Sequence, residues 1–409
     1  MAIVTTDSRY YSEIADAIRA VNGSSDSYTP AQMAAAILAL VDSGYLPRGY
    51  TLLEYIVSTG TQYIDTGFKP NQDTTVIADV SLASTGTQTI FGARTSSSAK
   101  TFSLIWMNSG YYRMHYNNGY TNFTAGLSDP TVRHTIRYEK NELTIGDASL
   151  SRTYASFQCD YNLMLLAVNT ANTVSLYTSA KLYACQIYDN GILVRQYVPC
   201  INPDGEVGMY DIVNGQFYGN AGTGTFTAGQ TLVESKYIES SGTQYINTEF
   251  VPNQDSRMVI DIQTDDFTKN YFAGSRYTTT QKAFAITTDS SMWQSGYNNS
   301  SPTTSLAADA DRHVCDLNKN VFSVDGAVAY EHTYAKFTGQ GSICIGAVLG
   351  SSKVYCDPGS KFYYCKIYDN GVLVRDYIPC LRSDGIYGLY DKANNKFYTN
   401  AGSGSFTGG

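Results

Sequence analysis

The stretch KIYDNGVLVRDYIPC, residues 366–380, occurs almost unchanged earlier in the chain as QIYDNGILVRQYVPC, residues 186–200. Eleven of the 15 positions are identical, and in each copy Asp-Asn-Gly separates two largely apolar runs. Asn and Gly tolerate the positive φ angles that the central positions of a tight hairpin turn require. The stretch therefore predicts a β-hairpin that the fold uses twice, although the cysteine that ends each copy also raises the question of a chemical role.

The repetition extends over most of the chain. Three other pairs of segments recur in the same order, 180–182 residues apart: EYIVSTGTQYIDTGFKPNQD (54–73) and KYIESSGTQYINTEFVPNQD (236–255), TYASF (153–157) and TYAKF (333–337), NAGTGTF (220–226) and NAGSGSF (400–406). A period of this length is far too long for a solenoid. We predict two consecutive domains, residues 53–229 and 230–409, each long enough to bury a core of its own.

The composition favours an all-β chain that does not bind nucleic acid. The 409 residues include 35 Tyr and 35 Gly, and Tyr suits strands whereas Gly suits tight turns. The net charge of −8 argues against a nucleic-acid partner, because phosphate binding needs clustered Lys and Arg. No run of 18 or more apolar residues occurs, so we expect no membrane insertion. The first residues, MAIVTTDSRYY, lack the basic and apolar regions of a signal peptide.

Residues 1–45 differ from the repeats and predict two short amphipathic helices. The second helix should begin with Thr29 as its N-cap and Gln32 as the capping-box partner. Tyr28 and Met33 have the spacing of a hydrophobic staple across this start. Such short helices bury too little surface to be stable alone, so we expect them to pack on a partner or to oligomerise.

The next residues, 46–52, predict a linker to the repeats. Beyond this linker, short alternating runs are broken by turn residues, which is typical of a β-sandwich.

Several features follow one another in the same order in each copy. An entry strand, TGTQYIDTG in the first copy, precedes an Arg-His pair, a tight turn and the hairpin quoted above. The Arg-His pairs are residues 133–134 and 312–313, and we place the turns at Asp147-Ala148 and Asp325-Gly326. This order resembles a laminin-G-like, concanavalin-type jelly roll. The resemblance implies two tandem jelly rolls preceded by a short two-helix module.

The segment IADAIRAVNGSSDSYTPAQMAAAI, residues 14–37, resembles a segment that heads many tail and tail-fibre proteins of phages infecting Gram-positive gut bacteria. Together, the two resemblances imply a phage tail adhesin, or receptor-binding protein, that recognises a host cell-surface glycan. They also imply contacts with other tail or baseplate proteins through residues 1–45, and a homotrimer. The implied location is the tail of the virion, which is assembled in the bacterial host cytoplasm.

No pattern in the sequence supports catalysis. Retaining glucanases of this fold carry two Glu flanking an Asp on one strand, since the reaction needs two carboxyl groups about 5 Å apart. No Glu-x-Asp-x-Glu and no G-x-S-x-G pattern occurs in this chain. His134 and His313 recur between the copies, as scaffold residues would. We therefore expect a protein that is not an enzyme; a structural virion spacer and a glycan-cleaving depolymerase are the alternatives.

Sugar-binding faces of jelly rolls combine aromatic rings with Asn, Asp or Arg. Such residues gather in the region that differs most between the copies. Our candidate glycan contacts are Arg94, Trp106, Tyr111, Tyr112 and Asn117 in the first copy, and Arg276, Trp293, Tyr297 and Asn298 in the second. Two alternatives stay open: the tryptophans are core residues that have drifted between strands, or the recurring arginines form buried ion pairs.

The eight cysteines show no CxxC spacing, which argues against the usual zinc and thioredoxin-like sites. Cys185, Cys200, Cys365 and Cys380 recur at the ends of apolar runs, so we predict that they are free thiols in the core. We expect no cofactor. A calcium ion at the rim is the one alternative, although the sequence has no EF-hand-type loop.

Overall fold

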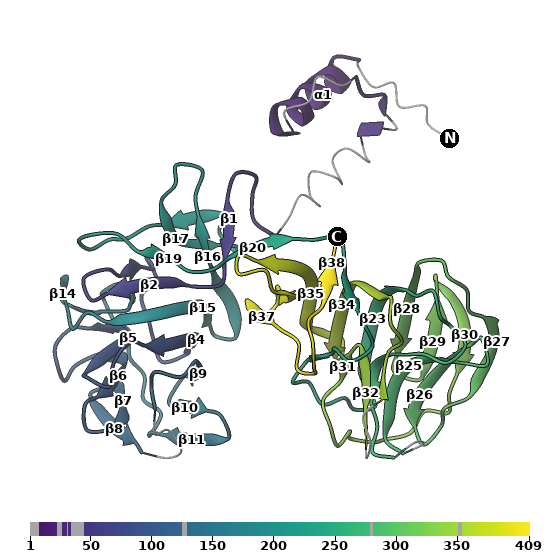
Figure 1. The fold of residues 1–409 in the computed structure, drawn as a ribbon. Helices are drawn as coiled ribbons and strands as arrows, with labels where there is room; N and C mark the ends of the chain where they lie inside the picture. The colour runs from purple at the N-terminus through teal and green to yellow at the C-terminus, as the bar shows by residue number, and fades with distance from the viewer. Residues whose placement is uncertain are drawn as a thin grey trace, which may run out of the picture. The chain divides into compact units, whose positions relative to one another are not determined.

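The computed structural model (Figure 1) describes seven stretches of the chain: residues 8–22, 27–30, 32–33, 45–124, 129–278, 281–350 and 354–409. The chain divides into two compact units, Met1–Tyr50 and Thr51–Gly409. The described residues of the second unit form strands and turns, so the all-β prediction is confirmed. Among the helical residues that are described, none forms a helix long and apolar enough to cross a membrane.

The first unit contains the helix α1 (Ser8–Asn22). Ala15 of α1 is buried and forms a small cluster with Met33. Tyr28 packs against this cluster, as the predicted staple requires. Ile14, expected on the same apolar face of α1, is instead 40% exposed.

The capping box predicted at the start of the second helix forms. The Thr29 backbone N–H donates to Gln32 Oε1 at 2.9 Å, and the Gln32 backbone N–H donates to Thr29 Oγ1 at 3.4 Å. These two bonds satisfy backbone donors that a helix start leaves without partners. Most of the predicted second helix lies outside the described residues.

We call residues 53–229 the first repeat and residues 230–409 the second repeat. The strands up to the end of the first repeat are β1 (Thr51–Leu53), β2 (Ile56–Thr59), β3 (Ile64–Asp65), β4 (Thr74–Leu82), β5 (Gln88–Arg94), β6 (Thr101–Met107), β7 (Tyr111–Asn117), β8 (Gly119–Phe123), β9 (His134–Glu139), β10 (Glu142–Ile145), β11 (Ala148–Ser151), β12 (Met164–Leu165), β13 (Val168–Thr170), β14 (Thr173–Ser175), β15 (Ser179–Asp189), β16 (Ile192–Ile201), β17 (Val207–Asp211), β18 (Gln216–Tyr218) and β19 (Thr227–Ala228).

The strands of the second repeat are β20 (Thr231–Glu234), β21 (Ile238–Ser240), β22 (Ile246–Asn247), β23 (Ser256–Gln263), β24 (Tyr271–Ser275), β25 (Ala283–Asp289), β26 (Met292–Asn298), β27 (Thr303–Ala307), β28 (His313–Asn318), β29 (Val321–Val324), β30 (Ala327–Glu331), β31 (Cys344–Ile345), β32 (Ala347–Leu349), β33 (Val354–Tyr355), β34 (Ser360–Asp369), β35 (Val372–Arg382), β36 (Tyr387–Asp391), β37 (Lys396–Tyr398) and β38 (Thr407–Gly408).

The strands of the first repeat belong to two sheets that enclose one hydrophobic core. The larger sheet runs β11–β10–β9–β4–β15–β16–β17–β18, and the smaller runs β14–β13–β5–β6–β7–β8. Val76 and Tyr138 from the larger sheet share one buried cluster with Phe102 and Met114 from the smaller sheet. The core therefore lies between two sheets, as in a β-sandwich.

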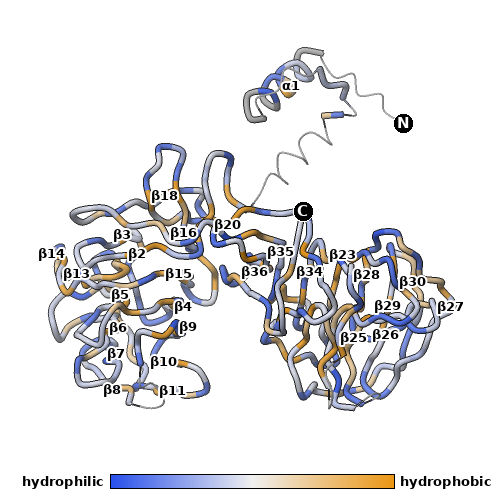
Figure 2. Tube along the Cα trace, in the orientation of Figure 1, coloured by the Kyte–Doolittle hydropathy of each residue, from blue (hydrophilic) through white to orange (hydrophobic). Residues whose placement is uncertain are grey.

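The second repeat is built in the same way. Its larger sheet runs β30–β29–β28–β23–β34–β35–β36–β37, and its smaller sheet contains β24–β25–β26–β27. Met258 and Leu317 from the larger sheet and Phe284 from the smaller sheet belong to a separate buried cluster. Hydrophobic residues colour many strands of both repeats, whereas many connecting loops are hydrophilic (Figure 2).

The stretch that recurs in both repeats forms the hairpins β15–β16 and β34–β35. The φ angles are 49° at Asn190 and 80° at Gly191, and 46° at Asn370 and 82° at Gly371. Both predicted turns are therefore confirmed. The eight cysteines, all within the described ranges, are buried and form no disulfide bond, and burial raises the pKa of the Cys200 thiol to about 12. Protonated core thiols give the stretch no chemical role, so it is scaffold.

A second pair of tight turns differs from the prediction by one residue. In the second repeat the turn is Asp325-Gly326, as predicted, with φ angles of 50° and 80°. In the first repeat Ile145 pairs with Ala148, so the turn is Gly146-Asp147 rather than Asp147-Ala148. Gly146 has a φ of 58°. Both turns contain a glycine, which is the first central residue in the first repeat and the second central residue in the second repeat. The prediction was wrong because it aligned Asp147 with Asp325.

Two short strands join the repeats. Leu52 of β1 pairs with Cys200 of β16, and Leu232 of β20 pairs with Arg382 of β35. β1 and β20 also pair with each other, and Leu52 lies opposite Leu232. The larger sheets are thus continuous through β16–β1–β20–β35, and the segment 46–52, expected as a linker, ends inside β1.

Candidate functional site

Both tryptophans lie in the cores, which corrects their assignment as glycan contacts. Trp106 and Trp293 are each 2% exposed. Trp106 of β6 lies opposite Tyr112 of β7, whereas Trp293 of β26 lies opposite Thr288 of β25. In the strand register, Trp106 corresponds to Thr288 and Tyr112 corresponds to Trp293. Each repeat therefore has a tryptophan in this cross-strand pair, but on the first of the two strands in one repeat and on the second in the other. The alternative of a core tryptophan that has drifted between strands is confirmed.

The assignment of Tyr112 and Tyr297 as ligand contacts is corrected for the same reason. Both are 1% exposed, and the Tyr297 hydroxyl donates to a backbone carbonyl at 3.2 Å. Asn117 and Asn298 end their strands with φ angles of 51° and 49°. Asn adopts this left-handed conformation more readily than most residues, so turn geometry is sufficient to explain why both recur.

The other candidates, Arg94, Tyr111 and Arg276, lie on or beside the outer faces of the two smaller sheets. Alternate residues of a strand face opposite sides, and the neighbouring positions of these strands are in the cores. A groove of about 210 Å³ lies on the outer face of the second repeat. It is lined by Lys269, Tyr271, Arg276, Ala283, Ala285, Thr287, Asp289, Gln294, Gly296 and Ser301. We call it the second-repeat groove.

Small residues make up the floor of the second-repeat groove. Ala285 of β25 lies opposite Gly296 of β26 and Gly274 of β24. A Cβ atom at Gly296 would lie 3.0 Å from Ala283 Cβ and 3.3 Å from Ser301 Oγ. The groove therefore exists because these positions carry almost no side chain, and a larger residue at Gly296 would occupy it.

Polar groups and one aromatic ring surround this floor. The Arg276 guanidinium carbon lies 5.6 Å from the centroid of the Tyr271 ring. Gln294 accepts a hydrogen bond from Thr287 at 3.0 Å, and Lys269 Nζ lies 3.5 Å from an Asp289 carboxylate oxygen. Within the described part of the chain, the Arg276 guanidinium has no carboxylate partner. The groove thus offers an unpaired cation, a ring and amide and hydroxyl groups to a polar ligand.

The same face of the first repeat is filled by larger side chains. The strand register places Ser103 and His115 where the second repeat has Ala285 and Gly296. Arg94 corresponds to Arg276, but its Nε donates to Thr170 Oγ1 at 2.7 Å. The predicted buried ion pair forms at neither arginine among the described residues. The two outer faces therefore have the same strand register but different side chains at corresponding positions.

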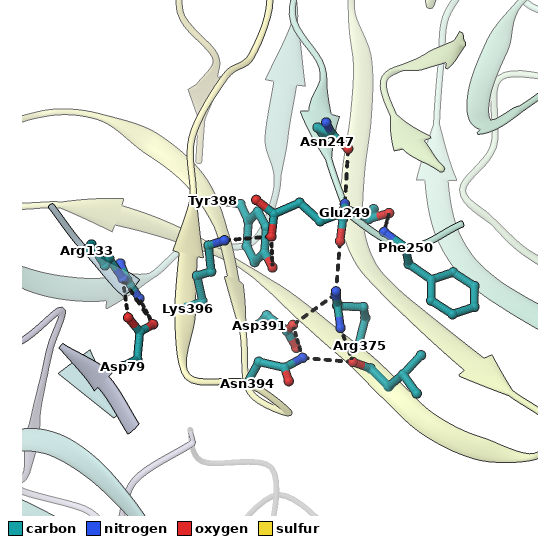
Figure 3. Close-up of polar contacts among 12 residues, drawn as sticks. Asp79, Arg133, Asn247, Glu249, Phe250, Arg375, Asp391, Asn394, Lys396 and Tyr398 are labelled. Carbon is teal, nitrogen blue, oxygen red and sulfur yellow. Dashed lines mark hydrogen bonds and ion pairs between the residues drawn. The ribbon is translucent and has the colours of Figure 1, made fainter. Parts of the chain in front are cut away.

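A second cavity, of about 170 Å³, lies between the repeats, and charged groups around it pair with one another (Figure 3). On the first-repeat side, Arg133 donates to both carboxylate oxygens of Asp79. On the second-repeat side, Lys396 donates to Glu249 at 2.7 Å, and Arg375 donates to a backbone carbonyl at 3.0 Å. Because these groups are satisfied internally, the cavity fits a junction between repeats better than a recognition site.

The recurring Arg-His pairs contribute scaffold contacts. Arg133 and Arg312 lie 3.9 and 3.7 Å from the centroids of Tyr183 and Tyr363, respectively. Arg312 also donates to both oxygens of Asp261 at 2.7 Å, as Arg133 does to Asp79.

The two histidines of these pairs have different surroundings. His313 Nδ1 and Nε2 lie 2.7 and 2.9 Å from carboxylate oxygens of Asp325 and Asp309. Burial lowers the pKa of His313, but the hydrogen bonds to Asp325 and then Asp309 outweigh it and raise the pKa above its usual value. His134 Nε2 instead lies 3.0 Å from a backbone carbonyl oxygen. Only part of the Arg-His motif is therefore shared.

Two groove residues, Lys269 and Tyr271, were missed by the sequence reasoning. The available signal was the alternation AFAITTD at residues 283–289, in which every second residue from Ala283 is small or polar. Together with Gly296 on the next strand, this pattern marks an open outer face. No group of three or more metal-ligating side chains capable of holding an ion occurs among the residues that the structure describes.

Comparisons with known proteins leave the chain without a family. No protein-family model and no curated protein matches its sequence. Among solved structures, it is similar to mouse laminin alpha1 chain, domains LG4-5, at 12% identity and a TM-score of 0.28, over 81% of this chain and 92% of that one.

Two structures of the sialidase NanB are similar at the same low level. The complex of NanB with Optactamide has 9% identity and a TM-score of 0.25, over 85% of this chain and 74% of that one. The K499G mutant of NanB from Streptococcus pneumoniae has 9% identity and a TM-score of 0.24, over 85% and 75%. Such likenesses say nothing about the activity or the ligand of this chain.

Proposed function

We propose that the chain is a non-catalytic adhesin that binds a host cell-surface glycan in the second-repeat groove. The observation that carries this proposal is the Arg276 guanidinium, which has no carboxylate partner among the described residues, beside the Tyr271 ring and above a floor of small residues. A sugar ring can pack its C–H face on such a ring, and its hydroxyl groups can accept hydrogen bonds from a guanidinium. Gln294 and Thr287 supply further polar groups within the same groove.

We further propose that the repeats are two tandem concanavalin-type, laminin-G-like jelly rolls, residues 53–229 and 230–409. Separate hydrophobic cores in the two repeats support this division. The arrangement of each core between two sheets, in which most neighbouring strands are antiparallel, supports the sandwich architecture.

We propose that this adhesin belongs to a phage tail, as the resemblance of residues 14–37 to the heads of tail proteins suggests. Residues 1–45 then contact other tail or baseplate proteins, and the chain acts as a homotrimer on the virion. The small cluster around Ala15 and Met33 supports a packed N-terminal module.

The groove lining also supports a role without catalysis. It contains one carboxylate, Asp289, which is paired with Lys269. Hydrolysis of a glycosidic bond by the common mechanisms needs two carboxyl groups, about 5–10 Å apart.

The test is a glycan array probed with the full chain, followed by titration calorimetry with the best-bound oligosaccharide. Replacing Arg276 with Gln should weaken binding roughly tenfold, because a charge-assisted hydrogen bond is lost. Arg137→Gln is the matched control, since it removes the same charge from β9 on the larger sheet and should leave the affinity unchanged.

Other outcomes favour the alternatives. A chain that labels no host cells and binds no glycan on the array would favour a structural spacer of the virion. Release of reducing sugar from host cell walls would instead favour a depolymerase.

A further inference from the structure

The outer face of the first repeat carries two arginines without carboxylate partners. Arg94 lies at the end of β5 and Arg113 on β7, and both are half-buried. Arg94 Nε donates to a threonine hydroxyl at 2.7 Å, and Arg113 Nε donates to the amide oxygen of Asn122 at 3.2 Å. Within the described ranges, neither guanidinium forms a salt bridge. By contrast, Arg133 and Arg312, next to strands of the larger sheets, each pair with an aspartate.

His115 is two residues from Arg113 on the same strand, so the two side chains lie on the same face of the sheet. It lies on β7 and is 6% exposed. Burial lowers its pKa to about 4, with further lowering by the charges of Arg94, Arg113 and Arg152. Among the residues that the structure describes, no carboxylate contributes to the pKa of His115, so its imidazole is neutral at pH 7.

An unsatisfied hydroxyl lies next to this histidine. Ser103 of β6 is opposite His115 in the strand register, and Gly92 of β5 is opposite Ser103. Ser103 is fully buried, and its Oγ has no hydrogen-bond partner. An unpartnered buried polar group costs about 1–3 kcal/mol.

The rim of this face is aromatic. The Tyr120 ring is 53% exposed and lies 4.4 Å from the Arg113 guanidinium carbon and 5.5 Å from the His115 ring. Arg113 also donates to the Tyr111 hydroxyl at 3.1 Å. Two tyrosines thus hold the Arg113 guanidinium while leaving its charge without a counter-ion.

We infer that the outer face of the first repeat binds the anionic group of an acidic saccharide, a carboxylate or a sulfate, at Arg94 and Arg113 beside His115 and Ser103. The inference rests on the proposed glycan-binding function. It adds a second binding site that prefers acidic saccharides, whereas the second-repeat groove prefers neutral ones. The anion supplies the missing counter-charge, and Tyr120 packs against the sugar ring. The second-repeat groove, with a paired lysine and a single free arginine, takes the neutral part of a glycan.

The test uses the full chain and three tetrasaccharides: one of galacturonic acid, one of sulfated galactose and one of neutral galactose. The two acidic ligands should compete for one site, and Arg113→Gln should weaken their binding roughly tenfold. Their affinity should also fall as sodium chloride is raised, since salt screens exposed charges. Arg276→Gln, in the other groove, is the matched control and should leave acidic binding unchanged. Binding of the uronic acid alone, or of the sulfate alone, would identify which anion the site takes.

His115 gives a readout that does not depend on the other groove. With four histidines in the chain, the imidazole resonances can be resolved by nuclear magnetic resonance. An acidic tetrasaccharide should shift the His115 resonances and raise its pKa, and Arg94→Gln with Arg113→Gln should abolish both effects.

The outcomes separate the two proposals. Acidic ligands that bind equally well to wild type and Arg113→Gln, and that leave His115 unmoved, would overturn this inference while the second-repeat groove could still bind glycan. Loss of neutral-tetrasaccharide binding in Arg276→Gln, with the acidic tetrasaccharides still shifting the His115 resonances, would support the inference independently. If the double variant fails to fold, the single Arg113→Gln variant decides, because Arg113 contacts the exposed ring of Tyr120 and the side chain of Asn122.

Discussion

The outer faces of the two smaller sheets have the same strands in the same register but opposite characters. Where the first repeat has Ser103 and His115, the second has Ala285 and Gly296. The first face is filled and cationic, whereas the second is an open groove. The buried faces of the same strands keep large apolar residues in both repeats. The comparison teaches that packing constrains the buried face of a strand and leaves its outer face free to diverge.

The largest expected effect tests whether the tryptophans belong to the shared core. Trp106→Ala and Trp293→Ala should each lower the free energy of unfolding by about 3–5 kcal/mol, because each removes a buried aromatic side chain. Urea denaturation measures this loss. The exposed Tyr277→Ala is the control and should change stability by less than about 0.5 kcal/mol. If the variants kept their stability but lost glycan binding, the tryptophans would be ligand contacts and not core residues.

The next prediction makes the second face resemble the first. Gly296→His places the first-repeat residue on the floor of the second-repeat groove, where even a Cβ atom meets Ala283 and Ser301. Glycan affinity should fall more than tenfold, by calorimetry, because the side chain occupies the space for the sugar. Gly341→His is the matched control, since a Cβ atom there has open space. Unchanged binding by Gly296→His would place the ligand elsewhere.

A pH titration separates the buried histidines of the two repeats from His313. Burial lowers the pKa of His115 and of His332 to about 4. A lowered pKa means that the unfolded state takes up the proton first, so stability is lost as the pH falls from about 6.5 toward 4. His115→Asn and His332→Asn should each flatten this part of the curve of unfolding free energy against pH.

His313 should act with the opposite sign, because its pKa is raised. Its stabilising contribution is complete below the ordinary imidazole pKa of about 6.5 and is lost as the pH rises through the raised value. His313→Asn should therefore destabilise the protein more at pH 6 than at pH 8. An equal loss at both values would contradict the charged hydrogen bonds to Asp309 and Asp325.

The smallest effect concerns the turns that differ between the repeats. Gly146→Ala and Gly326→Ala should each lower the free energy of unfolding by about 1 kcal/mol, because alanine disfavours the positive φ angles at both positions. A new Cβ atom has open space at both positions, so no steric clash adds to this cost. Asp147→Ala serves as the control. A loss at Gly326 alone would show that the first-repeat turn is formed differently.

Much of the fold could be predicted from the sequence because its signals are local. The Asp-Asn-Gly hairpins and the capping box at Thr29 each depend on a few adjacent residues, and the structure confirms them. The turn at Gly146-Asp147 was predicted one residue too late in the chain. A two-residue turn can join the same two strands with its glycine at either the first or the second central position, and the sequence alone did not distinguish the two.

The site was harder to predict, since it depends on which face of each strand is buried. Trp106 and Trp293 looked like divergent surface residues, but both occupy one core position shared by two neighbouring strands. Lys269 and Tyr271 join the groove only through the pairing of β24 with β25, which a linear sequence does not reveal. The small size of Ala285 and Gly296, which leaves the groove open, was the informative feature.

The most direct measurement uses the floor of the second-repeat groove itself. In a chain with labelled alanine methyl groups, addition of the best-bound oligosaccharide should move the resonances of Ala283 and Ala285, which line the groove. The methyl group of Ala273, which lies in the core, should not move. Saturable binding with Ala283 and Ala285 unmoved would contradict the proposal that this groove is the glycan site.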